Sequence, residues 1–269
     1  MLLNGCLVLY FLAALIGYIG LLSGKKTVER IAFVFSTVGV LFGLAFMITR
    51  WVKTGHPPMV RLFELTILFS WMIMVIGIVV SVRFKLGWLH PVAAIVVAIC
   101  MAATAFMDST VQPLVPALQS NWLTFHVITC FVSYAGFAVA FLIGLAYYIM
   151  RLGAAVHMTS SGAISDETTR VFEAVMYKCV LFGVPLLTIG IVTGAVWANS
   201  AWGTYWSWDP KETWSLITWI IYAMYLHLRK RPFWRGTRSI VFNMLGFAAV
   251  LFTWFGVNYV LTGLHSYSN

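Results

Sequence analysis

The chain has 269 residues, of which 61% are hydrophobic and only 9% are charged. A soluble globule of this size would lack the polar surface needed to cover itself, so the composition excludes an ordinary soluble domain. A formal net charge of +9 would suggest a nucleic-acid partner in a soluble protein, but here the basic residues fall in short connections between apolar runs. They therefore indicate membrane topology, and no nucleic-acid binding is expected.

The apolar runs follow one another along the chain, and each is long enough to cross about 30 Å of hydrocarbon as a helix. Helices are expected because lipid offers the backbone no hydrogen-bond partners. The sequence predicts an all-α, polytopic bundle that forms a single transmembrane domain over residues 1–269. Eight transmembrane helices are predicted, at 2–23, 31–49, 62–82, 90–107, 121–150, 173–198, 210–229 and 237–263.

The basic residues are unevenly divided between the two sides of this arrangement. Of the 17 lysines and arginines, all but four fall on the side of the connections that follow odd-numbered spans. The four exceptions are Arg50, Lys53, Arg61 and Lys211. The positive-inside rule then places both termini outside. The first span is expected to be retained as a helix, because no cleavable signal peptide is apparent. The connection at about 152–172 is predicted to be an inner surface segment.

A tryptophan-rich segment is predicted to form an external loop at about 199–214. It reads WGTYWSWDPKETW from Trp202 to Trp214, with Trp197 before it and Trp219 after it. Interfacial tryptophans ordinarily anchor a helix at the membrane surface, which accounts for two or three of these rings but not for their density. Closely packed flat rings make a platform for a large planar apolar ligand.

The end of this loop carries a helix-start signal. Asp209 as N-cap, Pro210 at the first helical position and Glu212 three residues after the cap predict a capping box that begins the seventh span. Such a cap would fix the loop rigidly at the mouth of the helix. Lys211 at this position is suited to meet a carboxylate, such as a haem propionate.

Two histidines are predicted to lie at the outer side. His126 falls about one turn into the fifth span, and His265 follows the eighth. Taken singly, each is typical of an interfacial polar residue. Together they come from different helices at the depth of the aromatic loop, and two imidazoles on opposite faces of a macrocycle are what six-coordinate haem iron requires.

His227 lies 17 residues beyond Pro210 on the same predicted helix, roughly 25 Å away at 1.5 Å per residue. It is therefore either a cation favoured in the last turn of a helix or a ligand at a second, inner haem position, and the sequence leaves both open. His56, His90 and His157 are interpreted as loop or helix-boundary residues.

Other polar groups carry weaker signals. Glu64 near the outer end of the third span, with Arg61 three residues earlier, is expected to form an i,i+3 pair or to support the outer pocket. The cysteines fall inside apolar segments without a C-x-x-C pair and are interpreted as buried thiols; they are Cys6, Cys100, Cys130 and Cys179.

These residues resemble the CcsA (ResC-like) family, the WWD-loop, haem-handling membrane component of system II cytochrome c maturation. The run from Trp202 to Trp219 is the most specific part of the resemblance. The other matching segments are Gly55–Pro58 with Leu62–Glu64, Leu114–Trp122 leading to His126, Gly194–Asn199, Tyr225–His227 and Gly263–Tyr267.

The resemblance implies that this chain is a subunit of a cytochrome c synthase, or haem lyase. Haem b, bound as substrate by pairs of histidines, would be presented for thioether attachment to the CXXCH motif of apocytochrome c. The resemblance makes His126 and His265 the outer axial ligands, and His227 one of two ligands to an intramembrane haem. A separate CcsB (ResB-like) protein would supply the other inner ligand, and thioredoxin-like proteins would reduce the apocytochrome thiols.

The candidate site residues follow from the resemblance and the loop together. The haem platform consists of Trp202, Trp206, Trp208 and Asp209, and the further haem-binding residues are Trp197, Tyr205, Lys211 and Trp214. The expected location is a bacterial inner (cytoplasmic) membrane or a thylakoid membrane. Two alternatives stay open: a haem-containing membrane electron carrier, and a haem-free transporter or scaffold.

Overall fold

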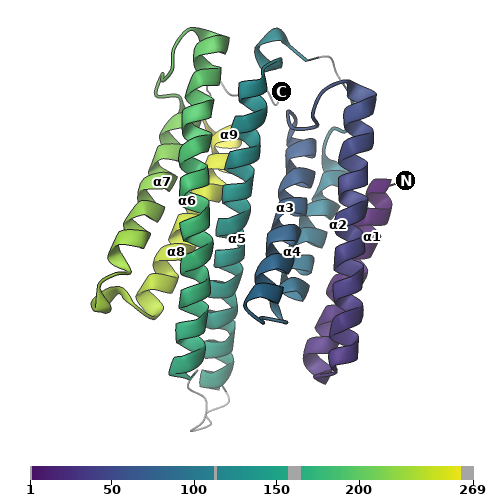
Figure 1. Cartoon of the computed structure of the whole chain (residues 1–269), viewed down its shortest axis with the longest axis vertical. Helices are drawn as coiled ribbons and strands as arrows, with labels where there is room; N and C mark the ends of the chain where they lie inside the picture. The colour runs from purple at the N-terminus through teal and green to yellow at the C-terminus, as the bar shows by residue number, and fades with distance from the viewer. Residues whose placement is uncertain (1, 112–113, 157–164, 262–269) are drawn as a thin grey trace. The chain divides into compact units, whose positions relative to one another are not determined.

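The computed structural model of the chain describes residues 2–111, 114–156 and 165–261, and these are helical apart from short connections (Figure 1). The α-helices are α1 (Leu2–Ser23), α2 (Lys26–Thr54), α3 (Leu62–Arg83), α4 (Leu89–Ala103), α5 (Asn121–Val156), α6 (Asp166–Trp202), α7 (Pro210–Leu228), α8 (Thr237–Leu251) and α9 (Val257–Val260). Three 3-10 turns lie in connections: η1 (Thr104–Phe106), η2 (Pro116–Leu118) and η3 (Pro232–Trp234). A π-helix, η4 (Phe252–Gly256), joins α8 to α9. The all-α prediction is confirmed over the described residues.

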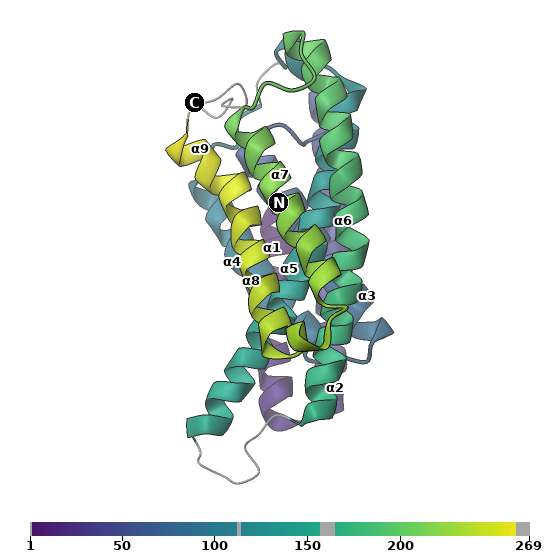
Figure 2. The same cartoon turned by 90° about the vertical axis from the view of Figure 1, so that its left-hand side faces the viewer.

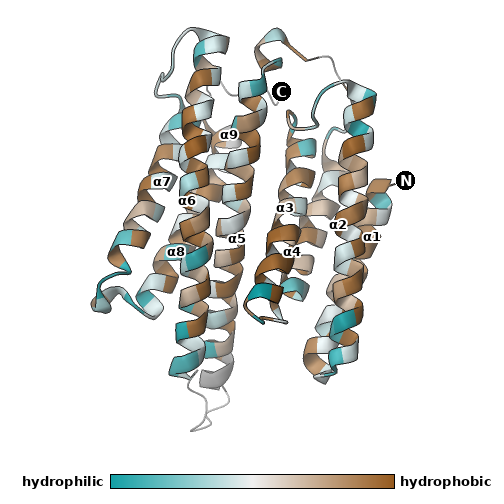
Figure 3. Ribbon diagram, viewed as in Figure 1, coloured by the Kyte–Doolittle hydropathy of each residue, from teal (hydrophilic) through white to brown (hydrophobic). Residues whose placement is uncertain are grey.

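Seven of the described helices are long and apolar enough to cross a membrane. Hydrophobic residues dominate their middles, whereas polar residues gather toward the ends (Figure 3). The 19-residue α7 is not among the seven, since its first turn is polar and aromatic residues replace aliphatic ones further on. The multi-pass prediction is confirmed, and seven spans with α7 agree with the expected eight. The outward placement of the termini stays a prediction.

Several boundaries differ from those predicted. The inner connection expected at about 152–172 is largely helical, because α5 continues to Val156 and α6 begins at Asp166. Ser165 is the N-cap of α6, and its side chain accepts a hydrogen bond from the Thr168 N–H at 3.1 Å. Residues 157–164 of this connection lie outside the described residues. The predicted eighth span is not one regular helix, since the π-helix interrupts it.

Backbone contacts divide the chain into two compact units, with the division between Val127 and Ile128 in α5. In the first unit, α1 packs along α2 and α4, and α3 packs against α4 and α2. Gly17 of α1 lies so close to α4 that an added Cβ would fall 2.5 Å from the Pro91 Cβ. Such close approach is how helices gain packing energy in lipid, where apolar contact alone gives no advantage.

The second unit contains the rest of α5 and α6 to α9. The rings of Phe137 on α5 and Tyr222 on α7 stack with centroids 3.7 Å apart. Trp219 Nε1 of α7 donates a hydrogen bond to the Thr188 hydroxyl of α6 at 2.8 Å. α7 and α8 run antiparallel and are joined by the turn that contains η3 (Figure 2). These contacts fix α6 and α7, which carry the tryptophan-rich loop between them.

Candidate functional site

The tryptophan-rich loop is shorter than the predicted external segment at about 199–214. α6 continues through Trp202, and Gly203 ends it in a left-handed conformation with φ of 80°. This conformation suits glycine because a Cβ would be strained there. The irregular backbone therefore spans only residues 203–209, and both of its ends are anchored on helices.

The capping box predicted at the start of α7 is confirmed. The Asp209 side chain accepts the Lys211 N–H at 3.0 Å, and the Glu212 carboxylate accepts the Asp209 N–H at 3.2 Å. Asp209 is only 6% exposed. The carboxylate of Asp209 thus serves the local backbone at the mouth of α7, and Pro210 occupies the first helical position as expected.

The aromatic residues of the loop separate into exposed and buried rings. Tyr205 is 59% and Trp208 is 68% exposed, and Trp206 stands edge-to-face to Trp208 with ring centroids 5.7 Å apart and an interplanar angle of 89°. In contrast, Trp197 is 2% exposed and packs against Trp202 at 4.8 Å. The rings open to a ligand are therefore those of Tyr205 and Trp208, with half-buried Trp206 beside Trp208, whereas Trp197 belongs to the packed interior.

Trp214 packs against the π-helix and does not join the rings of residues 205–208. Its ring contacts Phe252 of the π-helix, with centroids 4.2 Å apart. Its carbonyl accepts hydrogen bonds from the hydroxyls of Thr218 at 2.8 Å and Thr253 at 3.2 Å. π-Helical turns are enriched at functional sites, and this one packs directly on the first turns of α7.

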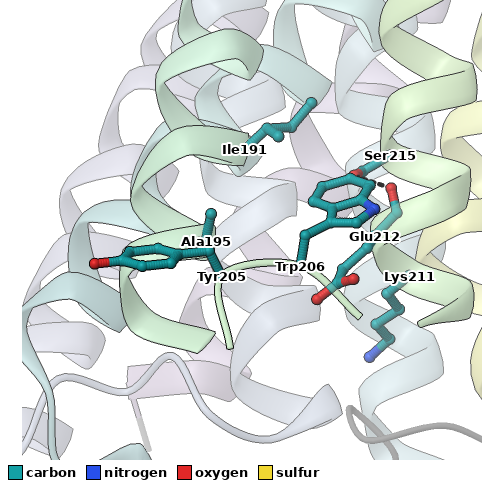
Figure 4. A pocket seen from close by; sticks show the side chains of 8 residues that line it. Ile191, Ala195, Tyr205, Trp206, Lys211, Glu212 and Ser215 are labelled. Carbon is teal, nitrogen blue, oxygen red and sulfur yellow. Dashed lines mark hydrogen bonds between the residues drawn. The ribbon is translucent and has the colours of Figure 1, made fainter. Parts of the chain in front are cut away.

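A small cleft opens between α6, the loop and α7 (Figure 4). Its volume is about 50 Å³, enough for one or two small chemical groups but not for a whole macrocycle. Small residues of α6 form one wall, and polar groups of α7 form the other. The lining residues are Ile191, Gly194, Ala195, Tyr205, Trp206, Lys211, Glu212 and Ser215. The cleft thus combines an apolar wall with a cation, Lys211, beside the exposed rings.

The predicted histidine ligands are placed as follows. His126 lies in the second turn of α5 and is half-buried, within the first of the two compact units. His227 is exposed in the last turn of α7. His265 lies outside the described residues, so the convergence of His126 and His265 stays a prediction. Within the ranges described, no three or more histidine, cysteine or acidic side chains cluster as a metal site.

The histidines not expected to be ligands sit in local structural contacts. The His56 ring Nδ1 lies 3.1 Å from the Pro57 carbonyl. His90 is 4% exposed, its Nδ1 lies 3.3 Å from the Ser81 hydroxyl, and its ring packs edge-on against Phe33. His157 lies outside the described residues. The cysteines are free thiols, as interpreted, although Cys100 is only half-buried.

The i,i+3 pair expected between Arg61 and Glu64 is wrong. Glu64 pairs instead with Arg50, whose Nε donates to the Glu64 carboxylate at 2.7 Å, and their side chains are only 3% and 11% exposed. The same carboxylate accepts the Val60 N–H at 3.2 Å. Arg50 stands near the end of α2, which continues five residues beyond the predicted span, and this extension brings it to Glu64.

Arg61 pairs with Asp108 in the connection that follows α4, at 2.6 Å. Asp108 also accepts the Thr110 N–H and hydroxyl, both at 2.9 Å. These hydrogen bonds from Thr110, followed by the Arg61 guanidinium, lower the pKa of the Asp108 carboxyl. No sequence pattern predicts this contact, because it joins residues 47 positions apart across an irregular connection.

The turn between α7 and α8 is held by another acidic residue. Glu173 of α6 is 5% exposed, and its carboxylate accepts the Gly236 N–H at 2.6 Å. The Arg229 guanidinium lies over the Tyr177 ring, 4.6 Å from its centroid. The turn next to His227 is therefore anchored to α6 from two sides, which the sequence pattern did not reveal.

These observations define a polytopic helical membrane protein that presents a rigidly anchored aromatic loop. Comparison with known proteins makes the class specific. The chain belongs to the family described as "Cytochrome C assembly protein", whose model matches residues 59–265, and more narrowly to the CcsA proteins of cytochrome c biogenesis.

The relatives cover most of the chain. It is 35% identical over 260 residues to "Cytochrome c biogenesis protein CcsA" of Chlamydomonas reinhardtii, which corresponds to 93% of this chain and 72% of that protein. It is also 35% identical over 252 residues to the protein of the same name in Synechococcus sp. (strain CC9902), with 83% of this chain and 82% of that protein covered.

A solved structure shares the fold. "Cytochrome c Heme Lyase CcmF" matches with a TM-score of 0.68 over 94% of this chain and 45% of that protein, at 19% sequence identity. At this identity the likeness concerns the fold. It shows that the helical arrangement seen here also occurs as part of a longer chain.

Proposed function

We propose that this chain is the haem-handling subunit of a cytochrome c synthase. It would present haem at the outer membrane face for covalent attachment to the CXXCH motif of apocytochrome c. The observation that carries the proposal is a pair of perpendicular rings, exposed Trp208 and half-buried Trp206, on a loop fixed between two helices of a cytochrome c assembly protein. Membership in the CcsA family, and the fold shared with a haem lyase, support it.

The platform residues would divide the binding of haem between them. Trp208, with Tyr205, offers an open aromatic face for stacking, and Trp206 forms a wall at a right angle to it. Trp202 packs against buried Trp197 at the end of α6, where the loop begins, and Trp214 fixes the first turns of α7 against the π-helix. Asp209 holds the loop at the helix mouth. Lys211, beside the cleft, would meet a propionate.

Histidines would hold the iron at two positions. His126 and His265 would be the axial ligands of haem b at the outer platform, one on each face of the ring. His227 would be one ligand of an inner haem, and the second would come from a CcsB (ResB-like) partner. The exposure of His227 on α7 supports this role, because a ligand shared with another chain has to be accessible.

The chemistry asks little of the protein beyond orientation. Each cysteine thiol of the apocytochrome adds across a haem vinyl group: sulfur bonds to one vinyl carbon, hydrogen goes to the other, and nothing leaves. Holding the vinyl edge next to the thiols makes the addition effectively unimolecular, which is a proximity effect. Thioredoxin-like proteins would keep these thiols reduced beforehand, and the apocytochrome histidine would displace one outer ligand.

The proposed location is a bacterial inner (cytoplasmic) membrane or a thylakoid membrane. Relatives in both Synechococcus and Chlamydomonas reinhardtii support this pair of alternatives. In either membrane the tryptophan-rich loop would face the compartment in which cytochromes c mature.

The test is the visible absorption spectrum of the detergent-purified protein, co-expressed with its CcsB-like partner. His126→Ala and His265→Ala are expected to remove one haem fraction and His227→Ala another, while His56→Ala serves as the control. A colourless wild-type protein would favour the haem-free scaffold. Haem that is retained stoichiometrically, cycles between redox states and never passes to apocytochrome would favour the electron carrier. Equal haem content in all variants would refute the ligand assignments.

A further inference from the structure

Glu212 does more in the tryptophan-rich loop than complete a capping box. Its carboxylate reaches past Asp209 to Ser207, accepting the Ser207 N–H at 2.8 Å and approaching the Ser207 hydroxyl at 3.3 Å. The same oxygen, Oε2, accepts the Asp209 N–H at 3.2 Å. One carboxylate on a regular helix therefore binds the backbone on both sides of Trp208.

Trp208 has a backbone conformation that needs such support. Its φ is 58°, and in the described part of the chain Lys85 is the sole other non-glycine residue with positive φ. Bulky side chains avoid this left-handed region because the Cβ crowds the backbone. Such a conformation persists when the surrounding contacts impose it. Here the contacts come from Glu212 and from the Thr213 hydroxyl, which donates to the Trp208 carbonyl at 3.2 Å.

The conformation decides where the ring points. A residue in the left-handed region directs its side chain differently from one in the extended region. Trp208 consequently stands 68% exposed and at 89° to the ring of Trp206. If the backbone relaxed to an ordinary extended form, the right angle between the two rings would be lost, although both tryptophans would still be present.

We propose that Glu212 is the positioning residue of the aromatic platform: by binding the N–H groups on both sides of Trp208, it holds the exposed ring perpendicular to Trp206. The inference rests on the proposed function for the identity of the ligand, haem. The role of Glu212 toward the loop itself does not depend on that ligand. An ionised carboxylate suits the task because its hydrogen bonds are roughly twice as strong as those of a neutral acceptor.

The first experiment uses the haem-free protein in detergent and measures hydrogen exchange of the Ser207 and Asp209 amides. Glu212→Ala is expected to speed exchange at both positions by about tenfold or more, since each amide loses a charge-assisted hydrogen bond. Glu212→Gln retains one acceptor oxygen without the charge, so its exchange rates should fall between those of the wild type and Glu212→Ala. Glu167→Ala, an exposed carboxylate in the first turn of α6, is the matched control and should change neither amide.

The second experiment separates positioning from simple stability. Circular dichroism in the Soret region of bound haem reports how the macrocycle is oriented toward nearby rings. Glu212→Ala removes the contacts to the residues on either side of Trp208, and Thr213→Val removes the contact to the Trp208 carbonyl, so both should alter this signal in the same direction. Glu212→Gln should restore most of it. If Glu212→Ala does not fold, Glu212→Gln and Thr213→Val still provide the comparison.

The outcomes distinguish the two proposals. Unchanged exchange at Ser207 and Asp209 in Glu212→Ala would overturn the positioning role. So would an unchanged Soret signal in every variant of a haem-binding protein, and the proposed function would then stand. A wild-type protein that binds no haem would overturn the proposed function, while the exchange data would still decide whether Glu212 holds the loop.

Discussion

The buried ion pair between Arg50 and Glu64 offers a quantitative test of the structure. We consider replacement of each residue alone, as Arg50→Met and Glu64→Leu, and of both together. Removing one partner of a buried pair costs about 3–5 kcal/mol, because the other charge is left uncompensated. The side chains are 11% and 3% exposed, so solvent relieves little of this cost.

The two single replacements differ in what remains. After Glu64→Leu, Arg50 still lies over the Phe63 ring at 5.2 Å and donates to the Ser109 carbonyl at 3.2 Å, which places its cost near 3 kcal/mol. The Val60 N–H also loses its acceptor. In the double variant no charge is stranded, and the loss should fall to about 1–2 kcal/mol, the cost of that unpaired amide.

The measurement is a double-mutant cycle from unfolding with SDS in mixed micelles. A coupling energy of about 4 kcal/mol or more is expected between Arg50 and Glu64, because the two single losses together exceed the loss in the double variant by that amount. The exposed pair of Arg61 and Asp108, with side chains 30% and 58% exposed, is the matched control and should couple much more weakly. Equal coupling in the two pairs would refute the argument that burial sets the cost.

Two further predictions concern the connections. Gly236 has φ of 72° and ψ of −139°, a combination that glycine alone adopts readily. Gly236→Ala should therefore destabilise the protein by about 1–3 kcal/mol in the same unfolding assay. An unchanged free energy of unfolding would contradict this backbone conformation. The pKa of Asp108 is lowered, so its pairing with Arg61 is present at neutral pH and is lost as the pH falls through the folded-state pKa. The carboxyl 13C resonance of Asp108 should titrate with a midpoint below the ordinary value of 3.8. A midpoint at or above 3.8 would count against the contact.

The sequence predicted the features that depend on local patterns. Apolar runs long enough to span the bilayer gave the helices, and the order Asp209, Pro210, Glu212 gave the start of α7, because a capping box is defined by spacing alone. Tyr205 and Trp208 are exposed, and their role in a platform stays a prediction. By contrast, the burial of Trp197 could not be predicted, since the sequence does not say which face of α6 packs inward.

The long-range polar contacts could not be predicted from the sequence, for a physical reason. Glu64 had a basic neighbour at a plausible helical spacing, Arg61, and the pattern favoured that pair. The structure gives Glu64 a partner 14 positions away, Arg50, because the two helix ends come together and bury the pair. Arg61 in the connection is then available to Asp108. Tertiary packing decides which of the two arginines pairs with Glu64. The spacing of residues along the chain carries no information about that packing.

The acidic residues reveal how this membrane protein fixes its connections. Three glutamates on helices each accept a backbone N–H from an adjoining or distant connection: Glu64 from Val60, Glu173 from Gly236 and Glu212 from Ser207. The chain has only eight acidic residues, so these three glutamates are a large share of them. Connections at a membrane surface have little apolar area to bury, and a charge-assisted hydrogen bond from a rigid helix replaces that packing. The tryptophan-rich loop then follows the same rule as the other two connections, and its distinction lies in the rings that the glutamate holds exposed.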